Sequence, residues 1–325
     1  MGLSFALGLA AAVGPAVFIS MIIYNSRSAY VHAADQAGMH FPPPTDLVYA
    51  LTFGTFVVVI VREWAEPLFA KLAKKVLAAK KLAIQDRVDR FAGCSFKFFA
   101  YVALSVYGYE CLKEETWFPR ALGGTAPNIS NTFVGWPLHQ GTLKMRYYYG
   151  AALSYHGHSI FFLMRQWSQG ARRNDFYEMT IHHLVTIALL CSSHMLNWTR
   201  IGAIVLFIHD VSDIFTYQIK AVTDMDSVVL TAVGFLACVG GWFYLRLFVL
   251  PMVVIRGILV HVPDEVADAL GWGVEAFALL LSALVCLHLY WMYMVLGMGK
   301  NAIMGKGVHN QDHYQLSMEG KHKAK

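Results

Sequence analysis

The stretch that decides the fold is Asp175-Phe-Tyr-Glu-Met-Thr-Ile-His182-His183-Leu-Val-Thr, and the segment His209-Asp210-Val-Ser-Asp213 follows it about one helix later. Both polar groups interrupt long apolar runs. An ionisable side chain inside a membrane helix costs about 2.5–3.5 kcal/mol on insertion scales. Because two adjacent apolar runs carry several such side chains, we expect them to perform chemistry within the membrane.

The composition is that of a membrane protein. Of the 325 residues, 57% are hydrophobic and 14% are charged, whereas soluble domains carry about 25% charged residues. The net charge of +5 is modest and unevenly placed, which indicates oriented membrane loops and not a nucleic-acid-binding surface. The five cysteines lie mostly in apolar stretches without CxxC spacing. We interpret them as small buried hydrophobic residues.

Eight apolar runs are long enough to cross a bilayer, which needs about 20 residues as a helix. The sequence therefore predicts an all-α, polytopic membrane bundle with seven to eight transmembrane helices. No charged segment precedes the first run, so we interpret it as a span and not as a cleaved signal peptide. The runs cover residues 3–24, 46–62, 94–111, 148–166, 178–196, 200–219, 228–250 and 272–297.

Basic residues set the predicted orientation, because short cytosolic loops are enriched in Lys and Arg. Segment 62–93, the pair Arg172 and Arg173, and the tail 300–325 are all basic. With eight spans they fall on one side, which we assign to the cytosol. Segment 62–93 alternates apolar and basic positions, so it is either an amphipathic helix on the cytosolic leaflet or a solvated loop.

Residues 112–146 then form a lumenal loop. This loop contains Asn128-Ile-Ser130, a weak candidate for N-glycosylation. A second sequon, at Asn197, is too close to the membrane to be a good acceptor.

The two polar stretches are predicted to meet. Asn174-Asp175 followed by Glu178 resembles a capping box, which starts the fifth span near residue 176. If the fifth and sixth spans pack antiparallel about a turn near residue 197, position 182 lies at the depth of position 213. The histidines and aspartates then meet slightly inside the cytosolic leaflet.

Helix geometry gives these side chains different roles. Asp210 and Asp213 share a face and could share one proton. His209 points about 100° away from Asp210, and His182 and His183 diverge by the same angle, since a helix has about 3.6 residues per turn. An imidazole in a dry site can act as general base or as nucleophile, and the sequence leaves this choice open.

The other intramembrane polar groups receive simpler interpretations. Arg246 and Lys220 are predicted to extend to the membrane interface, and Lys220 could also contact a polyanionic ligand. No catalytic metal is expected, because adjacent histidines diverge on a helix and the spaced histidine boxes of membrane di-iron enzymes are missing. Four further histidines are interpreted as structural or cavity-lining, namely His156, His158, His194 and His288.

The segment from Arg173 to Lys220 resembles the ceramide synthase family of TLC-domain membrane proteins. The likeness includes His182-His183, the Asn197-Trp-Thr-Arg200-Ile-Gly202 turn and His209-Asp210-Val-Ser-Asp213. It extends to the Arg246-to-Pro251 segment, to Leu287-His-Leu-Tyr-Trp291 and to Arg90 through Tyr109, and it covers residues 45–305. The first run and a short 62–93 loop, without the homeobox-like insert of many animal members, depart from the family pattern.

The resemblance implies N-acylation of a sphingoid long-chain base by a fatty acyl-CoA in the endoplasmic reticulum membrane. The family's activity rests on residues that correspond to His182, His183, Asp210 and Asp213. No cofactor is implied beyond acyl-CoA as co-substrate. Tentative CoA-binding residues at the cytosolic mouth are Arg172, Arg173, Lys220 and His209.

The implied organisation has four parts: an extra hydrophobic segment and lumenal loop at 1–45, the first family span and a basic segment at 46–93, a TLC-type catalytic domain with a six-helix core at 94–299, and a basic tail at 300–325. The tail ends in Lys321-His-Lys323-Ala-Lys325, which resembles a dilysine retrieval signal.

Two other functions stay open at this point. A TLC-domain protein can bind or regulate lipids without acylating them, and a histidine-box lipid oxygenase would contain iron. The expected partners are acyl-CoA, a sphingoid base and membrane lipids, with a homodimer, heterodimer or accessory subunit also conceivable. Chain length, the preferred base and oligomeric state are not readable from the sequence.

Overall fold

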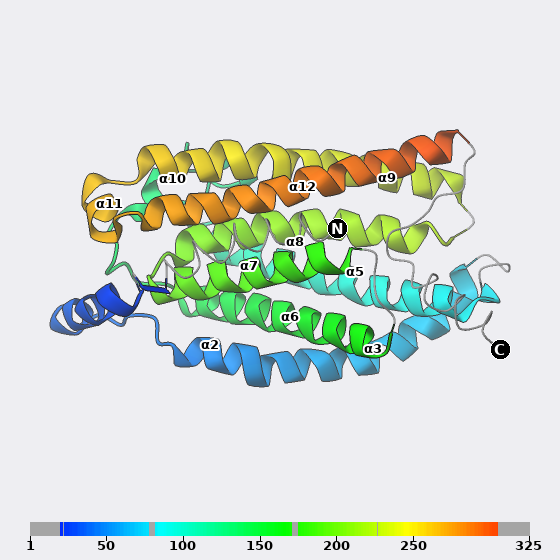
Figure 1. Ribbon diagram of the computed structural model, residues 1–325, viewed down its shortest axis with the longest axis horizontal. Coiled ribbons are helices and arrows are strands. Elements are labelled where there is room, and N and C mark those ends of the chain that lie inside the picture. Colours follow the sequence, from blue (N-terminus) through cyan, green and yellow to red (C-terminus); the bar gives the residue numbers. More distant parts are fainter. Residues whose placement is uncertain (1–19, 22, 78–81, 171–174, 226, 305–325) are drawn as a thin grey trace.

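The computed structural model describes residues 20–21, 23–77, 82–170, 175–225 and 227–304, and all regular structure within them is helical. Figure 1 shows the long helices side by side along the long axis of the molecule. Residues 20–21 and 23–36 are helical at one end of the bundle. Most of the first predicted span and of the basic tail lies outside the described residues.

The described residues form a bundle of seven long helical rods. Two of them join shorter pieces without a break: α2 (Thr45–Tyr49), a π-helical turn (Ala50–Gly54) and α3 (Thr55–Val76) form one rod, and α9 (Val228–Trp242), a π-helical segment (Phe243–Ile255) and α10 (Arg256–His261) form another. The other five are α5 (Gln85–Leu112), α6 (Leu143–Ser168), α7 (Phe176–Met195), α8 (Thr199–Val222) and α12 (Gly273–Ile303).

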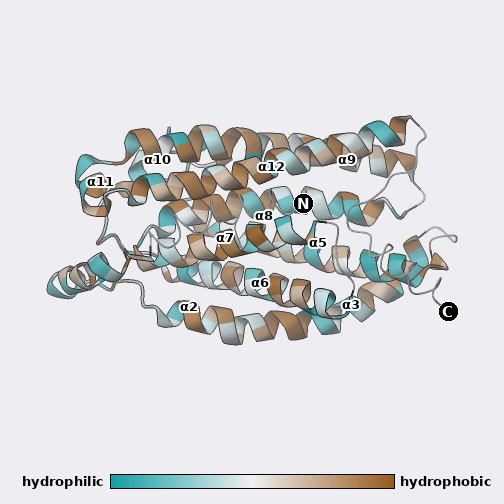
Figure 2. Ribbon diagram, viewed as in Figure 1, coloured by the Kyte–Doolittle hydropathy of each residue, from teal (hydrophilic) through white to brown (hydrophobic). Residues whose placement is uncertain are grey.

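Four rods are long and apolar enough to cross a membrane by length and composition: Thr45–Val76, Gln85–Leu112, Val228–His261 and Gly273–Ile303. α6, α7 and α8 carry the buried histidines and aspartates, which lower their hydropathy. Figure 2 shows apolar residues along the shafts and hydrophilic residues concentrated toward the two ends. Large apolar side chains such as Phe53, Leu236 and Tyr293 are exposed on the outer faces, as expected where lipid is the solvent.

Several helices are longer than predicted, because the apolar runs in the sequence stop before the helices end. Segment 62–93 belongs largely to the two neighbouring helices: α3 continues to Val76, and α5 already begins at Gln85. Arg62, assigned to that segment, is 6% exposed and lies inside the bundle. Its guanidinium pairs with Glu66 at 2.7 Å, contacts the His158 ring nitrogen at 3.2 Å and stacks on Phe162.

α8 is the central helix and contacts α5, α6, α7, α9 and the π-helical segment. α7 lies against α6, α8 and α12. The largest buried cluster joins α6, α7, α8, α10 and α12. The fold therefore places the two polar stretches of the sequence at the centre of the bundle, each with neighbours on several sides.

The fifth predicted span begins where expected, with α7 at Phe176. The predicted capping bond is not formed: Asp175 occupies the cap position, but its side chain makes no cap hydrogen bond. The short turn to α8 is held by Asn197, which has φ +55°. Its amide donates to the carbonyls of Pro137 at 2.7 Å and His139 at 3.0 Å.

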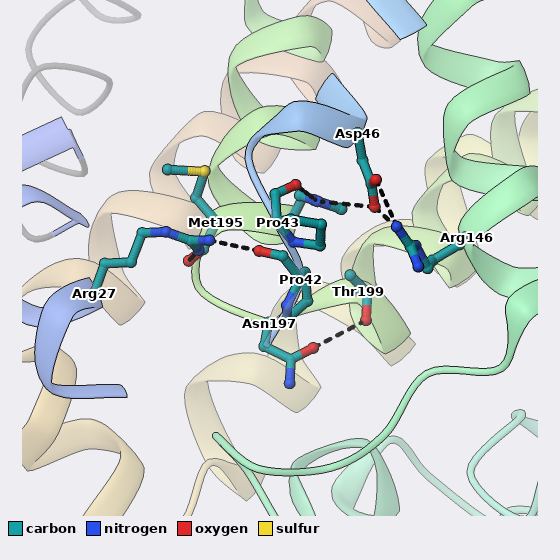
Figure 3. Close-up of polar contacts among 9 residues, drawn as sticks. Arg27, Pro42, Pro43, Asp46, Arg146, Met195, Asn197 and Thr199 are labelled. Carbon is teal, nitrogen blue, oxygen red and sulfur yellow. Dashed lines mark hydrogen bonds and ion pairs between the residues drawn. The ribbon is translucent and has the colours of Figure 1, made fainter. Parts of the chain in front are cut away.

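A polar corner ties the loop 113–142 and the N-terminal helix to this turn. Figure 3 shows Arg27 reaching the carbonyls of Met195 and Pro42, and Asp46 facing Arg146 in a two-bond ion pair at 2.6 and 2.8 Å. His139 is buried in the loop, and burial, with the positive charge of Arg200, lowers its pKa to about 3. His139 is therefore neutral, and this end of the bundle is closed by well-packed polypeptide.

Candidate active site

A cavity lies between α7, α8 and α12 and is lined by three of the four predicted catalytic residues and by His209. Its polar lining comes from four helices: Tyr101 on α5, His156 on α6, His182 on α7, and His209, Asp210 and Asp213 on α8. The remaining lining is largely apolar and leads to Trp198 and Phe277, whose rings stack at 5.0 Å. The cavity is thus polar at one end and apolar along the rest.

The predicted meeting of the two polar stretches is present in the structure. His182, Asp210 and Asp213 all line the cavity, and the ring centroid of His182 is 6.3 Å from that of His209. His183 occupies a different place: it is 6% exposed and is not among the cavity-lining residues. Its ring packs against His156 at 5.7 Å and His182 at 5.4 Å. The divergence of adjacent side chains on a helix explains this difference.

The two aspartates have different partners. The hydroxyl of Tyr148 donates to Asp210 Oδ2 at 2.8 Å, and both residues are almost fully buried. Asp213 instead forms an ion pair with Arg246, whose Nη2 is 2.8 Å from Oδ1. The two aspartates are therefore held by separate contacts, and the sharing of a proton between them stays a prediction.

Arg246 was predicted to extend to the membrane interface, and this prediction was wrong. The helix continues to His261, so Arg246 lies inside the span, 2% exposed. Its guanidinium donates to Ser212 Oγ at 2.6 Å and to the His209 carbonyl at 3.3 Å, and it stacks on Trp242 at 4.1 Å. The π-helical segment around it contains Pro251; such segments accommodate a missing backbone donor and are frequent at functional sites.

The histidines differ in their hydrogen bonds. His209 Nδ1 lies 2.7 Å from the Val205 carbonyl. Because a carbonyl can only accept, Nδ1 carries the hydrogen, and the neutral ring keeps an acceptor at Nε2. Among the described residues, neither His209 Nε2 nor His182 Nδ1 has a hydrogen-bond partner. His156 Nδ1 also has no partner there, so each of the three cavity-lining histidines has a ring nitrogen without a hydrogen bond.

His288 stands behind the cavity-facing pair and was predicted to be structural or cavity-lining. It is completely buried on α12, with its ring centroid 5.1 Å from His209 and 6.2 Å from His182. Trp291 lies 5.4 Å from His182 and closes the same side. The sequence analysis assigned neither His288 nor Trp291 to catalysis, although both belong to the Leu287-to-Trp291 segment that resembles the family.

The remaining predicted residues are placed elsewhere. Arg172 and Arg173 lie outside the described residues. Lys220 is half-buried at the end of α8, with its ammonium 5.4 Å from the Tyr217 ring centroid. Asn128 is half-buried in the loop, and its Oδ1 accepts from the backbone and hydroxyl of Ser130. His194 contacts the Pro43 carbonyl.

No group of three His, Cys, Asp or Glu side chains within the described part of the chain is arranged to hold a metal ion. The histidine-box hypothesis requires such a group. The cavity presents three imidazoles, those of His156, His182 and His209, and two differently paired carboxylates at its polar end. This set can activate a nucleophile and transfer protons without further ligands.

Apolar helices that enclose polar side chains define an integral membrane protein with a buried polar cavity. Comparison with known proteins places the chain among these: residues 90–297 match the TLC domain, and the chain belongs to the TLC-domain family. The match covers α5 to α12, which includes every described cavity-lining residue.

Curated relatives are similar over most of the chain. Ceramide synthase LOH2 of Arabidopsis thaliana is 28% identical over 220 residues, which is 67% of this chain and 71% of the relative. Ceramide synthase hyl-1 of Caenorhabditis elegans is 27% identical over 65% of this chain and 57% of its own length. Ceramide synthase LOH1 of Arabidopsis thaliana is 25% identical over 87% of this chain and 94% of the relative.

Proposed function

We propose that the protein is a ceramide synthase, an acyltransferase that forms an amide between a fatty acyl-CoA and a sphingoid long-chain base. Membership of the TLC-domain family and the names of the relatives support this function. The observation that carries it is the placement of His182, His209, Asp210 and Asp213 at one end of an otherwise apolar cavity. An acyl chain needs apolar walls, and amide formation needs a proton acceptor beside them.

The preferred mechanism has two steps. A ring nitrogen of His182 attacks the thioester carbonyl, the C–S bond breaks, and the CoA thiolate leaves with a proton. The amine of the base then attacks the acyl-imidazole, the new C–N bond forms, and the imidazole is released. His182 is supported as the nucleophile because it lines the cavity and its Nδ1 has no partner within the described structure.

The simpler mechanism is direct attack of the amine on the thioester, with a histidine as general base. His209 suits this role, because its Nε2 is held as an acceptor by the Nδ1 bond to Val205. In either mechanism a base must take the amine proton, so His209 serves as the general base in both. The Asp213–Arg246 pair fixes the adjoining turn of α8, since Arg246 also holds the His209 carbonyl.

The proposal includes the membrane topology and the compartment. The described rods, together with the N-terminal hydrophobic segment, favour seven to eight spans, with the α3–α5 and α8–α9 turns in the cytosol. Lys80 and Lys81 between α3 and α5, and Arg172 and Arg173 between α6 and α7, support this orientation. Residence in the endoplasmic reticulum, the identity of the base and any second subunit belong to the same proposal.

The decisive experiment is acylation by membranes that contain the full chain. We expect product from a sphingoid base and an acyl-CoA, and a loss of at least about 100-fold in His182→Ala, since removal of one catalytic group costs several powers of ten. His183→Ala should retain more activity, because His183 is not on the cavity wall. His261→Ala, at the end of α10, is the matched control.

Two results bear on the assignments separately. Product that survives His182→Ala would remove His182 from the reaction. Intact-mass analysis after addition of acyl-CoA alone tests the mechanism: an added acyl group that is missing in His182→Ala supports the two-step route. Unmodified enzyme under single-turnover conditions, with product still formed, supports direct attack with His209 as base.

A further inference from the structure

A group of cations occupies the seam between α5 and α8, away from the histidines. Lys97 on α5 and Lys220 on α8 place their ammonium groups 5.0 and 5.4 Å from the same ring, that of Tyr217. Arg90 lies seven residues before Lys97, about two turns closer to the start of α5, and one of its guanidinium nitrogens donates to the Lys220 carbonyl at 3.1 Å. Three cationic side chains from two helices therefore gather at one place.

Among the described residues, Asp224 is an acidic residue of this seam that arginines already engage. Asp224 is fully buried, Arg87 Nη1 lies 3.2 Å from its Oδ1, and Arg90 Nε lies 3.8 Å from its Oδ2. Arg90 is itself 8% exposed, and its Nη1 has no hydrogen-bond partner among the described residues. A buried guanidinium donor without an acceptor costs free energy. A bound ligand that supplies an acceptor to Arg90 would remove this cost.

The seam is connected to the cavity by stacked aromatic rings. Tyr217 stacks on Tyr101 with ring centroids 5.5 Å apart and planes 10° apart, and Tyr101 lines the cavity. Along α8, Lys220 follows Asp213 by seven residues, about 10 Å at the rise of an α-helix. A molecule that reacts beside Asp213 could therefore extend a polar arm along α8 to the seam.

We propose that Arg90, Lys97 and Lys220 form a phosphate-binding clamp that holds the nucleotide end of the acyl-CoA, while the thioester reaches the histidines. This rests on the proposed function, because it assigns a second part of the same substrate. Cations that converge from two helices bind phosphate through charge-assisted hydrogen bonds. Lys97 lies in the middle of an apolar helix. Because a charged side chain at such a position costs free energy, its presence indicates a function.

Substrate truncation combined with mutation tests the clamp. Lys97→Gln and Lys220→Gln should each raise the KM for acyl-CoA about tenfold with kcat unchanged, the effect of losing one charged hydrogen bond. With the matching acyl-pantetheine thioester, which has no nucleotide, the same variants should have the KM of the wild type. Lys75→Gln, an exposed lysine near the end of α3, is the charge-matched control. Equal KM changes with both thioesters, or no change with acyl-CoA, would overturn the clamp.

Direct binding separates this proposal from the proposed function. Purified full-length protein in phosphatidylcholine nanodiscs should bind adenosine 3′,5′-bisphosphate, and Lys97→Gln and Lys220→Gln should weaken that binding about tenfold. Charge-dependent binding by a protein that makes no ceramide would keep the clamp and remove the function. If the protein makes ceramide but neither lysine affects nucleotide binding, the proposed function stands and the clamp is overturned.

The phosphate could also belong to a lipid headgroup. Nanodiscs that contain phosphatidic acid distinguish the two sources. Undiminished nucleotide binding and KM in the presence of phosphatidic acid support the clamp as a CoA site. Competition by phosphatidic acid that depends on Lys97 and Lys220, without any effect of these lysines in phosphatidylcholine alone, would reassign the clamp to lipid and overturn the proposal.

Discussion

At the scale of single residues, the site depends on partners that make two similar aspartates different. Asp210 receives a hydrogen bond from Tyr148, and Asp213 is paired with Arg246. The two carboxylates share a helix face, but one contacts a neutral phenol and the other a cation. The site therefore holds one carboxylate by charge and the other by a single oriented donor.

Tyr148→Phe should isolate the contribution of that donor. The phenyl ring keeps the volume of the side chain but leaves Asp210 Oδ2 without its buried partner, which costs about 1.5–3 kcal/mol for a bond to a charged group. We expect kcat to fall about tenfold with the KM values for both substrates unchanged, because Tyr148 does not line the cavity. Steady-state kinetics of the purified variant measure this split.

The adjacent residue supplies the control for this prediction. Tyr147→Phe changes the same group on an exposed side chain of α6 and should leave kcat as in the wild type. A Tyr148→Phe enzyme with full kcat would show that Asp210 needs no fixed donor. A rise in KM instead would indicate that Tyr148 shapes the cavity and does not act through Asp210.

The sequence predicted the acidic and imidazole groups of the site but not their partners. His182, Asp210 and Asp213 could be placed at one depth because antiparallel helices about a short turn bring equal separations together. Arg246 was placed wrongly, since hydropathy ended its span at residue 250 while the helix continues to His261. Tyr148 comes from a distant helix and sits among three consecutive tyrosines, so no local pattern distinguishes it.

At the scale of elements, α8 is the central helix of the bundle, and its close contacts limit the substitutions that it tolerates. Gly202, near its start, is the clearest case. A methyl group there would lie 1.6 Å from the Tyr149 hydroxyl and 2.9 Å from Ser193 Oγ. These two atoms form a buried hydrogen bond between α6 and α7 at 2.5 Å. Glycine therefore allows three helices to meet at this point.

Gly202→Ala should push Tyr149 away and break the bond between α6 and α7. Inserting a methyl group into a packed interior typically costs about 1–3 kcal/mol, so the thermal unfolding midpoint should fall by several degrees. Gly150→Ala, one residue from Tyr149, meets no atom within 4 Å and should unfold at the wild-type temperature or above it. Thermal unfolding of both variants in one detergent makes the comparison; equal midpoints would mean that the helices can separate at no cost.

Helix existence was predictable from hydropathy, whereas helix ends were not. α7 and α8 begin within two residues of their predicted starts, because polar turns bound their apolar runs. α3 and α5 extend well past the predicted limits through basic residues such as Arg62 and Arg90. Those arginines find acceptors and aromatic rings inside the bundle, and only the tertiary packing reveals them.

At the scale of the whole molecule, the two ends of the bundle are chemically different. One end joins the α3–α5 and α8–α9 turns, where Leu77 pairs with Met225 and Arg87 with Asp224. The other end carries the loop 113–142, held by Arg27, Asn197 and the Asp46–Arg146 pair. The proposed clamp lies at the first end, so the direction of insertion decides whether it faces a cytosolic co-substrate.

Cysteine labelling in sealed microsomes tests that direction. Lys75→Cys, exposed near the end of α3, should react with a membrane-impermeant maleimide in intact vesicles, because basic turns remain on the cytosolic side. Thr125→Cys, exposed in the 113–142 loop, should react only after the vesicles are permeabilised. The background carries Cys286→Ser, since Cys286 is exposed, and is also labelled without an added cysteine. If only Thr125→Cys were labelled in intact vesicles, the protein would have the opposite orientation in the membrane. The clamp would then face the lumen, out of reach of cytosolic acyl-CoA.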